Sequence, residues 1–252
     1  MAARSLRARL RAGERVLTVF CLVPSVEMVE LIALAGFDAV ILDTEHGPYG
    51  IDSLGPLVLA ARARGIDAIV RVRTNEPSLI GAALDAGAAG VLVPQVGSRL
   101  AAEAAVAAAR FAPEGHRGAN PWVRGGDFGA REGWFQIAND EVAVIVMIEG
   151  TEGVAAAAQI LATPSLDAVF LGPVDLSHAL GVPGEVDHPD VIATIERVMA
   201  EGRRHGLAVA LFTPSAERGR QWFERGAGLV AVGCDTAHAL AGLRQVVAAT
   251  RD

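Results

Sequence analysis

The chain has 252 residues, of which 52% are hydrophobic, and its formal net charge is −7. This composition is typical of a globular protein and excludes a disordered chain, while the acidic charge and the scattered arginines argue against a nucleic-acid partner. Two cysteines are too few for a disulfide framework or a thiolate metal site.

The basic residues exclude one mechanism for any reaction at a carbonyl group. All 22 of them are arginine, so the chain has no lysine amine with which to form a Schiff base.

The start of the chain favours a cytoplasmic protein with no membrane partner. No apolar run approaches the roughly 18 residues that a membrane span needs, and the N-terminus lacks the apolar stretch of a secretory signal. Residues 1–16 are basic and amphipathic, which gives them some likeness to a transit peptide. We interpret them instead as a short surface helix before the first strand.

Short apolar, β-rich runs alternate with helical patterns along the chain. The runs predict eight strands, at residues 16–23, 37–43, 67–72, 89–96, 142–149, 167–173, 207–214 and 229–235. Ala-rich or amphipathic segments predict helices at residues 26–36, 52–65, 77–88, 98–111, 190–206, 216–227 and 237–250. Residues 111–141 form one long irregular stretch with two of the three tryptophans, which predicts a functional or interface loop.

This alternation predicts an α/β fold, a (β/α)8 TIM barrel, as a single domain over residues 1–252. A doubly wound open sheet is the alternative. Its dinucleotide-binding form is disfavoured, because no G-x-G-x-x-G turn follows the first predicted strand.

Polar residues gather at the predicted strand ends, where such barrels carry their active sites. They are Asp43, Glu45 and His46 after the second strand, Arg71 and Arg73 at the third, Gln95 at the fourth, Glu149 at the fifth, Asp175 after the sixth and Asp235 at the eighth.

Glu149 and Asp175 follow neighbouring apolar strands, so both carboxylates are expected at the same end of the barrel. Two converging carboxylates favour a hard divalent cation such as Mg²⁺ or Mn²⁺. Alternatively, each pairs with an arginine or caps a helix, and the spacing leaves both interpretations open.

His46 is a candidate general base, because imidazole titrates near neutral pH and Asp43 is close enough in sequence to orient it. The alternative is a histidine satisfied by backbone at the "HGP" turn. Arg71 ends a buried strand and can clamp a carboxylate or a carbonyl oxygen; its alternative is an ion pair with Glu45 or Asp85. In "GPVDLSHALG", Gly172 and Pro173 would bring backbone N–H groups close to a ligand carboxylate.

Six segments occur in an order and spacing that carry a resemblance over essentially the whole chain. They are "GFDAVILDTEHGPY", "IVRV", "LDAGAAGVLVPQV", "MIEG", "FLGPVDLSHALG" and "VAVGCDT". Together they resemble the HpcH/HpaI family of metal-dependent pyruvate aldolases, of the 4-hydroxy-2-oxoheptanedioate and 2-keto-3-deoxy sugar acid type. The resemblance implies a (β/α)8 barrel whose last helix is swapped between subunits, in a homo-hexamer built as a trimer of dimers.

The resemblance also implies roles for individual residues. Glu149 and Asp175 would bind a divalent cation (Mg²⁺, Mn²⁺ or Co²⁺), and His46 with Asp43 would be the base and its partner. Arg71 would hold the keto or enolate oxygen. The backbone from Gly172 through Pro173 and Val174 to Asp175 would form the cradle for the substrate carboxylate. Glu45 would lie behind a metal-bound water, and Asp85 would lie outside the direct metal ligands. Arg124 would reach a neighbouring subunit's site.

The implied reaction is the reversible cleavage of a 4-hydroxy-2-oxo acid to pyruvate, or a close relative, and an aldehyde. Relatives often carry Trp, Gln and a smaller residue where this chain has Phe20, Met147 and Phe212, all expected near the substrate, so the aldehyde is left open. Two alternatives are a synthase that condenses an oxo-acid enolate with a keto acid, and a non-catalytic or phosphate-binding barrel.

Overall fold

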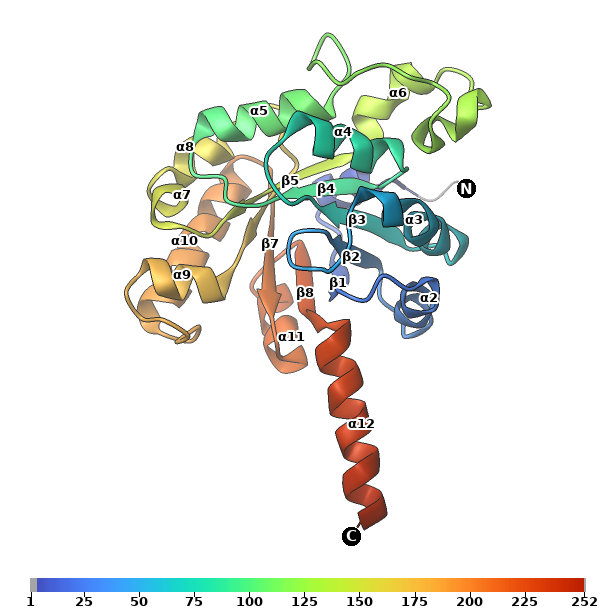
Figure 1. Ribbon diagram of the computed structural model, residues 1–252. Coiled ribbons are helices and arrows are strands. Elements are labelled where there is room, and N and C mark those ends of the chain that lie inside the picture. Colours follow the sequence, from blue (N-terminus) through green and yellow to red (C-terminus); the bar gives the residue numbers. More distant parts are fainter. Residues whose placement is uncertain (1–3, 252) are drawn as a thin grey trace.

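The computed structural model describes residues 4–251, and its parallel strands close into a barrel (Figure 1). Each strand pairs with the next along the chain, and β8 closes on β1. The strands are β1 (Val16–Cys21), β2 (Ala39–Asp43), β3 (Asp67–Arg71), β4 (Gly90–Val93), β5 (Ala143–Ile148), β6 (Ala168–Leu171), β7 (Ala208–Thr213) and β8 (Leu229–Cys234). The predicted (β/α)8 barrel is therefore confirmed, and the open-sheet alternative is wrong.

Helices follow the strands and cover the outside of the barrel. They are α1 (Leu6–Arg11), α2 (Val26–Leu34), α3 (Leu54–Ala63), α4 (Pro77–Asp85), α5 (Arg99–Ala109), α6 (Trp134–Glu141), α7 (Thr151–Ala155), α8 (Ala157–Leu161), α9 (Pro173–Ala179), α10 (Pro189–Arg204), α11 (Ala216–Glu224) and α12 (Asp235–Arg251), with short 3₁₀ helices η1 (Ile51–Ser53) and η2 (Arg124–Gly129).

Two parts of the secondary-structure prediction need correction. The stretch 111–141 is not irregular throughout, because η2 and α6 lie within it. The sixth predicted strand is two residues too long: β6 ends at Leu171, and Pro173 begins α9 instead. Proline lacks the N–H that a central strand donates, but its fixed φ suits the first turn of a helix.

The strands are apolar on both faces because each face packs against other apolar groups. One set of side chains fills the barrel interior, among them Phe20, Ile41, Ile69, Ile145 and Phe170. The other set packs against the surrounding helices. This double burial explains why the strands appear in the sequence as continuous apolar runs.

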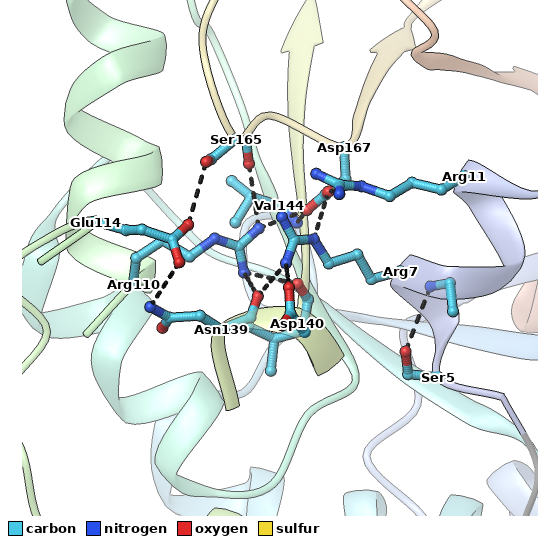
Figure 2. Close-up of polar contacts among 12 residues, drawn as sticks. Ser5, Arg7, Arg11, Arg110, Glu114, Asn139, Asp140, Val144, Ser165 and Asp167 are labelled. Carbon is cyan, nitrogen blue, oxygen red and sulfur yellow. Dashed lines mark hydrogen bonds and ion pairs between the residues drawn. The ribbon is translucent and has the colours of Figure 1, made fainter. Parts of the chain in front are cut away.

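Helix α1 closes the barrel at the N-terminal ends of the strands. Leu6 and Leu10 are 0% and 2% exposed and belong to the interior cluster. Arg7 is buried as well, and Figure 2 shows its guanidinium beside Asp167, which also accepts from Arg11 and Arg110. The expected surface helix exists, and its inner face, with Leu6, Arg7 and Leu10, closes the barrel while Arg11 is exposed.

Helix α12 extends away from the barrel (Figure 1). Its first residue, Asp235, is buried and accepts N–H groups of Leu22 and Val23. The apolar residues further along are exposed by 47% to 66%: Leu240, Leu243, Val246 and Val247. No helix within residues 4–251 combines the length and the apolar character that crossing a membrane requires.

Candidate active site

Two adjoining cavities lie at the C-terminal ends of the strands, and His46 and Asp175 line both. The smaller, of about 250 Å³, has mainly apolar walls with Asp43 and Arg71 among its lining residues. The larger, of about 720 Å³, is acidic and includes Glu45 and Glu149. The predicted strand-end residues other than Arg73 and Asp235 thus line these cavities at one opening of the barrel.

Arg71 is held by two carboxylates. Its Nε lies 2.8 Å from Asp43 Oδ1 and its Nη2 lies 2.6 Å from Asp43 Oδ2, while Nη1 lies 3.1 Å from Glu45 Oε2. The guanidinium also stacks over the Phe20 ring at 4.6 Å. These contacts use three of the five N–H donors, so two remain for a substrate oxygen. The ion pair with Glu45 is confirmed and the one with Asp85 is wrong, while the substrate-binding role of Arg71 stays a prediction.

The loop after β2 places His46 at the cavity wall. Asp43 Oδ1 accepts the backbone N–H groups of Glu45 and His46, at 3.1 and 3.3 Å. A Cβ on Gly47 would lie 2.0 Å from the backbone oxygen of Asp43, so the chain can turn this tightly only at glycine. Tyr49 fixes the loop from beneath, because its hydroxyl accepts the Asp43 N–H and donates to the Cys21 carbonyl.

The side chain of His46 does not meet Asp43 as expected. Its Nε2 lies 3.9 Å from Glu45 Oε2, and the side chain is 70% exposed. Asp43 contacts only the backbone of His46, because its oxygens are taken by Arg71 and by two backbone N–H groups. The structure thus corrects the expected pairing, and Glu45 becomes the carboxylate nearest to the imidazole.

Glu149 and Asp175 converge on Gly172. A Cβ at Gly172 would lie 3.5 Å from Glu149 Oε2 and 3.2 Å from Asp175 Oδ2, so both carboxylates border the same small space. Gln95, at a left-handed φ of 55°, donates its backbone N–H to Glu149 Oε1 at 2.7 Å. Burial, with the charge of Asp175 adding to it, raises the pKa of Glu149.

The surroundings of this acidic pair suit a cation. Within residues 4–251, no ion pair joins Glu149 or Asp175 to an arginine, so the alternative of arginine pairing is wrong. Asp175 does lie in the first turn of α9, where the helix dipole favours a carboxylate. No group of three His, Cys, Asp or Glu side chains in the described residues could hold a metal unaided. Mg²⁺ commonly takes one or two carboxylates and completes its shell with water and substrate, so two carboxylates fit such an ion.

Two predicted site residues lie elsewhere. Asp85 ends α4, and its Oδ1 accepts from Arg117 Nη2 at 2.7 Å. Helices run antiparallel to the strands, so the C-terminal end of α4 lies at the end of the barrel opposite to the active site. The prediction that Asp85 lies near the active site of its own chain is therefore wrong. Arg124 begins η2 and stacks over Phe128 at 5.3 Å. Its reach to another subunit's site stays a prediction.

The structure adds residues to which the sequence analysis gave no role. Phe170 lines the smaller cavity, and Glu152 and His178 line the larger one. The two-residue alternation of β6 could have placed Phe170 inside the barrel. No local pattern distinguishes Glu152 or His178 from a surface residue.

Comparisons with known proteins identify the relatives of this chain. The family model described as HpcH/HpaI aldolase/citrate lyase matches residues 17–241. A 5-keto-4-deoxy-D-glucarate aldolase from Klebsiella pneumoniae is 37% identical over 91% of this chain and 90% of its own. The solved structure of an HpcH/HpaI aldolase/citrate lyase family protein from Burkholderia cenocepacia is 36% identical, with a TM-score of 0.93 over 99% of this chain and all of the other. The solved citrate synthase SbnG is 32% identical, with a TM-score of 0.88 over 98% and 97% of the two chains.

Proposed function

The chain belongs to the HpcH/HpaI aldolase/citrate lyase family, and we propose how its own residues carry the chemistry. It is a carbon–carbon lyase, an aldolase that reversibly cleaves a 4-hydroxy-2-oxo acid to pyruvate, or a related 2-oxo acid, and an aldehyde. The convergence of Glu149 and Asp175 beside Arg71 and His46 is the observation that carries the residue assignment.

Glu149 and Asp175 would hold a divalent cation: Mg²⁺, Mn²⁺ or Co²⁺. Two neighbouring carboxylates, half-buried Glu149 and exposed Asp175, have no arginine ion pair within residues 4–251, and their mutual repulsion would be relieved by a cation. When bound, the cation would supply positive charge to the substrate's carboxylate and keto oxygens and to the enolate that forms on cleavage.

Arg71 would hold the C2 oxygen as negative charge develops there. Asp43 and Glu45 fix the guanidinium before the substrate arrives, so no reorganisation is needed during the reaction. The backbone from Gly172 to Val174 would lie against the substrate carboxylate. The chain has no lysine, so an imine route through a lysine amine is not open to it.

His46 would move the protons, taking one from the 4-hydroxyl group in cleavage and returning one to C3 of the enolate. It lines both cavities, and its Nε2 lies beside Glu45, which would orient the ring. Replacing His46 by Ala is therefore expected to abolish proton exchange at C3 of pyruvate while leaving metal binding intact. Unchanged exchange would contradict the assignment of the base.

Helix α12 supports a homo-oligomer. Its exposed apolar residues, Leu240, Leu243, Val246 and Val247, would be covered if α12 packed on the barrel of a partner, as the resemblance implies for a swapped helix in a hexamer. Sedimentation of the wild-type protein beside Leu243→Glu would test this: the variant should form smaller assemblies. A monomeric wild-type protein would contradict it. The cytoplasmic location stays a prediction from the sequence.

A pyruvate-release assay coupled to lactate dehydrogenase tests the aldolase with a panel of 4-hydroxy-2-oxo acids. Activity should disappear with EDTA and return with Mn²⁺, Mg²⁺ or Co²⁺. Activity unaffected by EDTA would contradict the metal assignment. Absence of both metal binding and turnover across the panel would favour the non-catalytic barrel.

The second candidate is a synthase on the same barrel, and the likeness to the citrate synthase SbnG favours keeping it. It would use the same enolate but add it to a keto acid. Condensation with keto acids, without cleavage of any 4-hydroxy-2-oxo acid, would distinguish it from the aldolase.

A further inference from the structure

The smaller cavity has an apolar wall next to Arg71, whose guanidinium stacks over the Phe20 ring. Phe20, Met147 and Phe170 are 6%, 2% and 1% exposed. The Phe20 ring packs edge-to-face against Phe170 and Phe212, with centroids 5.9 and 6.0 Å apart. These side chains carry no charge and no hydrogen-bond donor, so a part of the substrate that lies against them meets hydrocarbon.

Positive charge is scarce in both cavities. Of residues 4–251, Arg71 is the one arginine that lines either cavity, and Asp43 and Glu45 already engage it. The chain contains no lysine. The larger cavity has two histidines, His46 and His178, among four carboxylates: Glu45, Glu149, Glu152 and Asp175.

A substrate with two carboxylates would therefore be poorly accommodated. The first would be held beside Arg71 and the cation, but the second would face either phenyl rings or the larger cavity, whose lining adds Glu45 and Glu152 to the two metal-binding carboxylates and contains no arginine. Burying an unpaired carboxylate costs far more free energy than a hydrocarbon group gains there.

Resting on the proposed aldolase function, we infer that the substrate is a 4-hydroxy-2-oxo monocarboxylate whose remaining substituent is an apolar chain or ring, seated against Phe20, Phe170 and Phe212. The aldehyde formed or accepted is then apolar too. The cavity, of about 250 Å³, would also hold the pyruvate half beside Arg71, so the apolar group would occupy the part against these rings. This differs from the Klebsiella pneumoniae relative, which is named for a glucarate, a molecule with a carboxylate at each end.

The test compares aldehydes of similar size that differ in charge. With the assembled protein, pyruvate and Mn²⁺, kcat/KM is measured for pentanal against succinic semialdehyde, and for benzaldehyde against 4-carboxybenzaldehyde. The uncharged member of each pair should be favoured at least about 10-fold, which corresponds to roughly 1.4 kcal/mol. An equal or greater kcat/KM for the charged member would overturn the inference.

A variant with an added cation tests the physical reason. Val174 lines the smaller cavity and is 43% exposed, so an arginine fits there without disturbing the core. Val174→Arg should shift the preference toward the carboxylated aldehydes by about 10-fold, whereas the uncharged control Val174→Met should not. If both variants shift it equally, charge is not the determinant and the inference fails.

Two further measurements separate the possible failures. Solvent deuterium exchange at C3 of pyruvate needs no aldehyde: exchange together with a preference for charged aldehydes would overturn this inference alone, while absence of both exchange and turnover would overturn the aldolase and the inference together. If wild-type protein prefers charged aldehydes and Arg124→Ala abolishes that preference, a neighbouring subunit supplies the missing cation and the inference is wrong.

Discussion

Asp43 and Arg71 lie opposite each other in the register of β2 and β3 and form a bidentate ion pair, with Nε–Oδ1 and Nη2–Oδ2 distances of 2.8 and 2.6 Å. Their side chains are 1% and 11% exposed. Because both residues belong to strands of the closed barrel, the orientation of the guanidinium is set by the barrel and not by a loop.

Arg71→Lys is expected to fold and to lose activity. A lysine keeps the positive charge but cannot contact Asp43 bidentately and still offer donors to a substrate oxygen. The kcat should fall about 100-fold. Steady-state kinetics check this, with circular dichroism as the control for folding. Activity within threefold of wild type would show that charge alone is sufficient.

Gly47→Ala is expected to displace His46. The new Cβ would lie 2.0 Å from a backbone oxygen, which cannot move without opening the turn. A displacement of about 1 Å at a catalytic group can cost about 100-fold in rate. Gly50→Ala is the matched control in the same loop, because nothing lies within 4 Å of its Cβ. Equal kcat values for the two variants would contradict the role given to the turn.

Glu149→Gln is expected to separate metal binding from folding. Removing a half-buried charge beside Asp175 should raise the thermal midpoint in EDTA, while Gln can still accept the Gln95 N–H. Saturating Mn²⁺, at about 100 times its Kd, should raise the wild-type midpoint by about 5–10 °C and that of the variant by less than half as much. Differential scanning calorimetry measures both. An equal shift in the two proteins would place the metal elsewhere.

Asp167→Asn is expected to destabilise the fold from the far end of the barrel. Figure 2 shows Arg7, Arg11 and Arg110 around this carboxylate, which is 0% exposed. Losing it leaves buried guanidinium groups without their counter-charge, which costs about 3–5 kcal/mol.

Urea denaturation tests this prediction, with Asp140→Asn as the control. Asp140 also contacts Arg7, but its side chain is 80% exposed, so its loss should cost less than about 1 kcal/mol. Similar costs for the two variants would mean that burial does not govern the network.

The sequence by itself determined the barrel and the end that carries the polar groups. A parallel strand buried on both faces must be apolar throughout, so "AVILD" and "AVIVMI" identify strands without further information. A charged residue at the C-terminal end of such a strand, or a few residues after it, lies at that opening of the barrel. This is why Asp43, Glu149 and Asp175 could be placed at one opening.

The tertiary structure decided which partner each of these groups has. Asp43 contacts Arg71 rather than the ring of His46, Asp85 lies at the opposite end of the barrel, and the inner face of α1 closes the barrel and buries Arg7. The physical reason is that polarity and the spacing of apolar residues are properties of a short segment. The choice of an ion-pair partner depends instead on distances between segments far apart in the chain, which are fixed only once the barrel has closed.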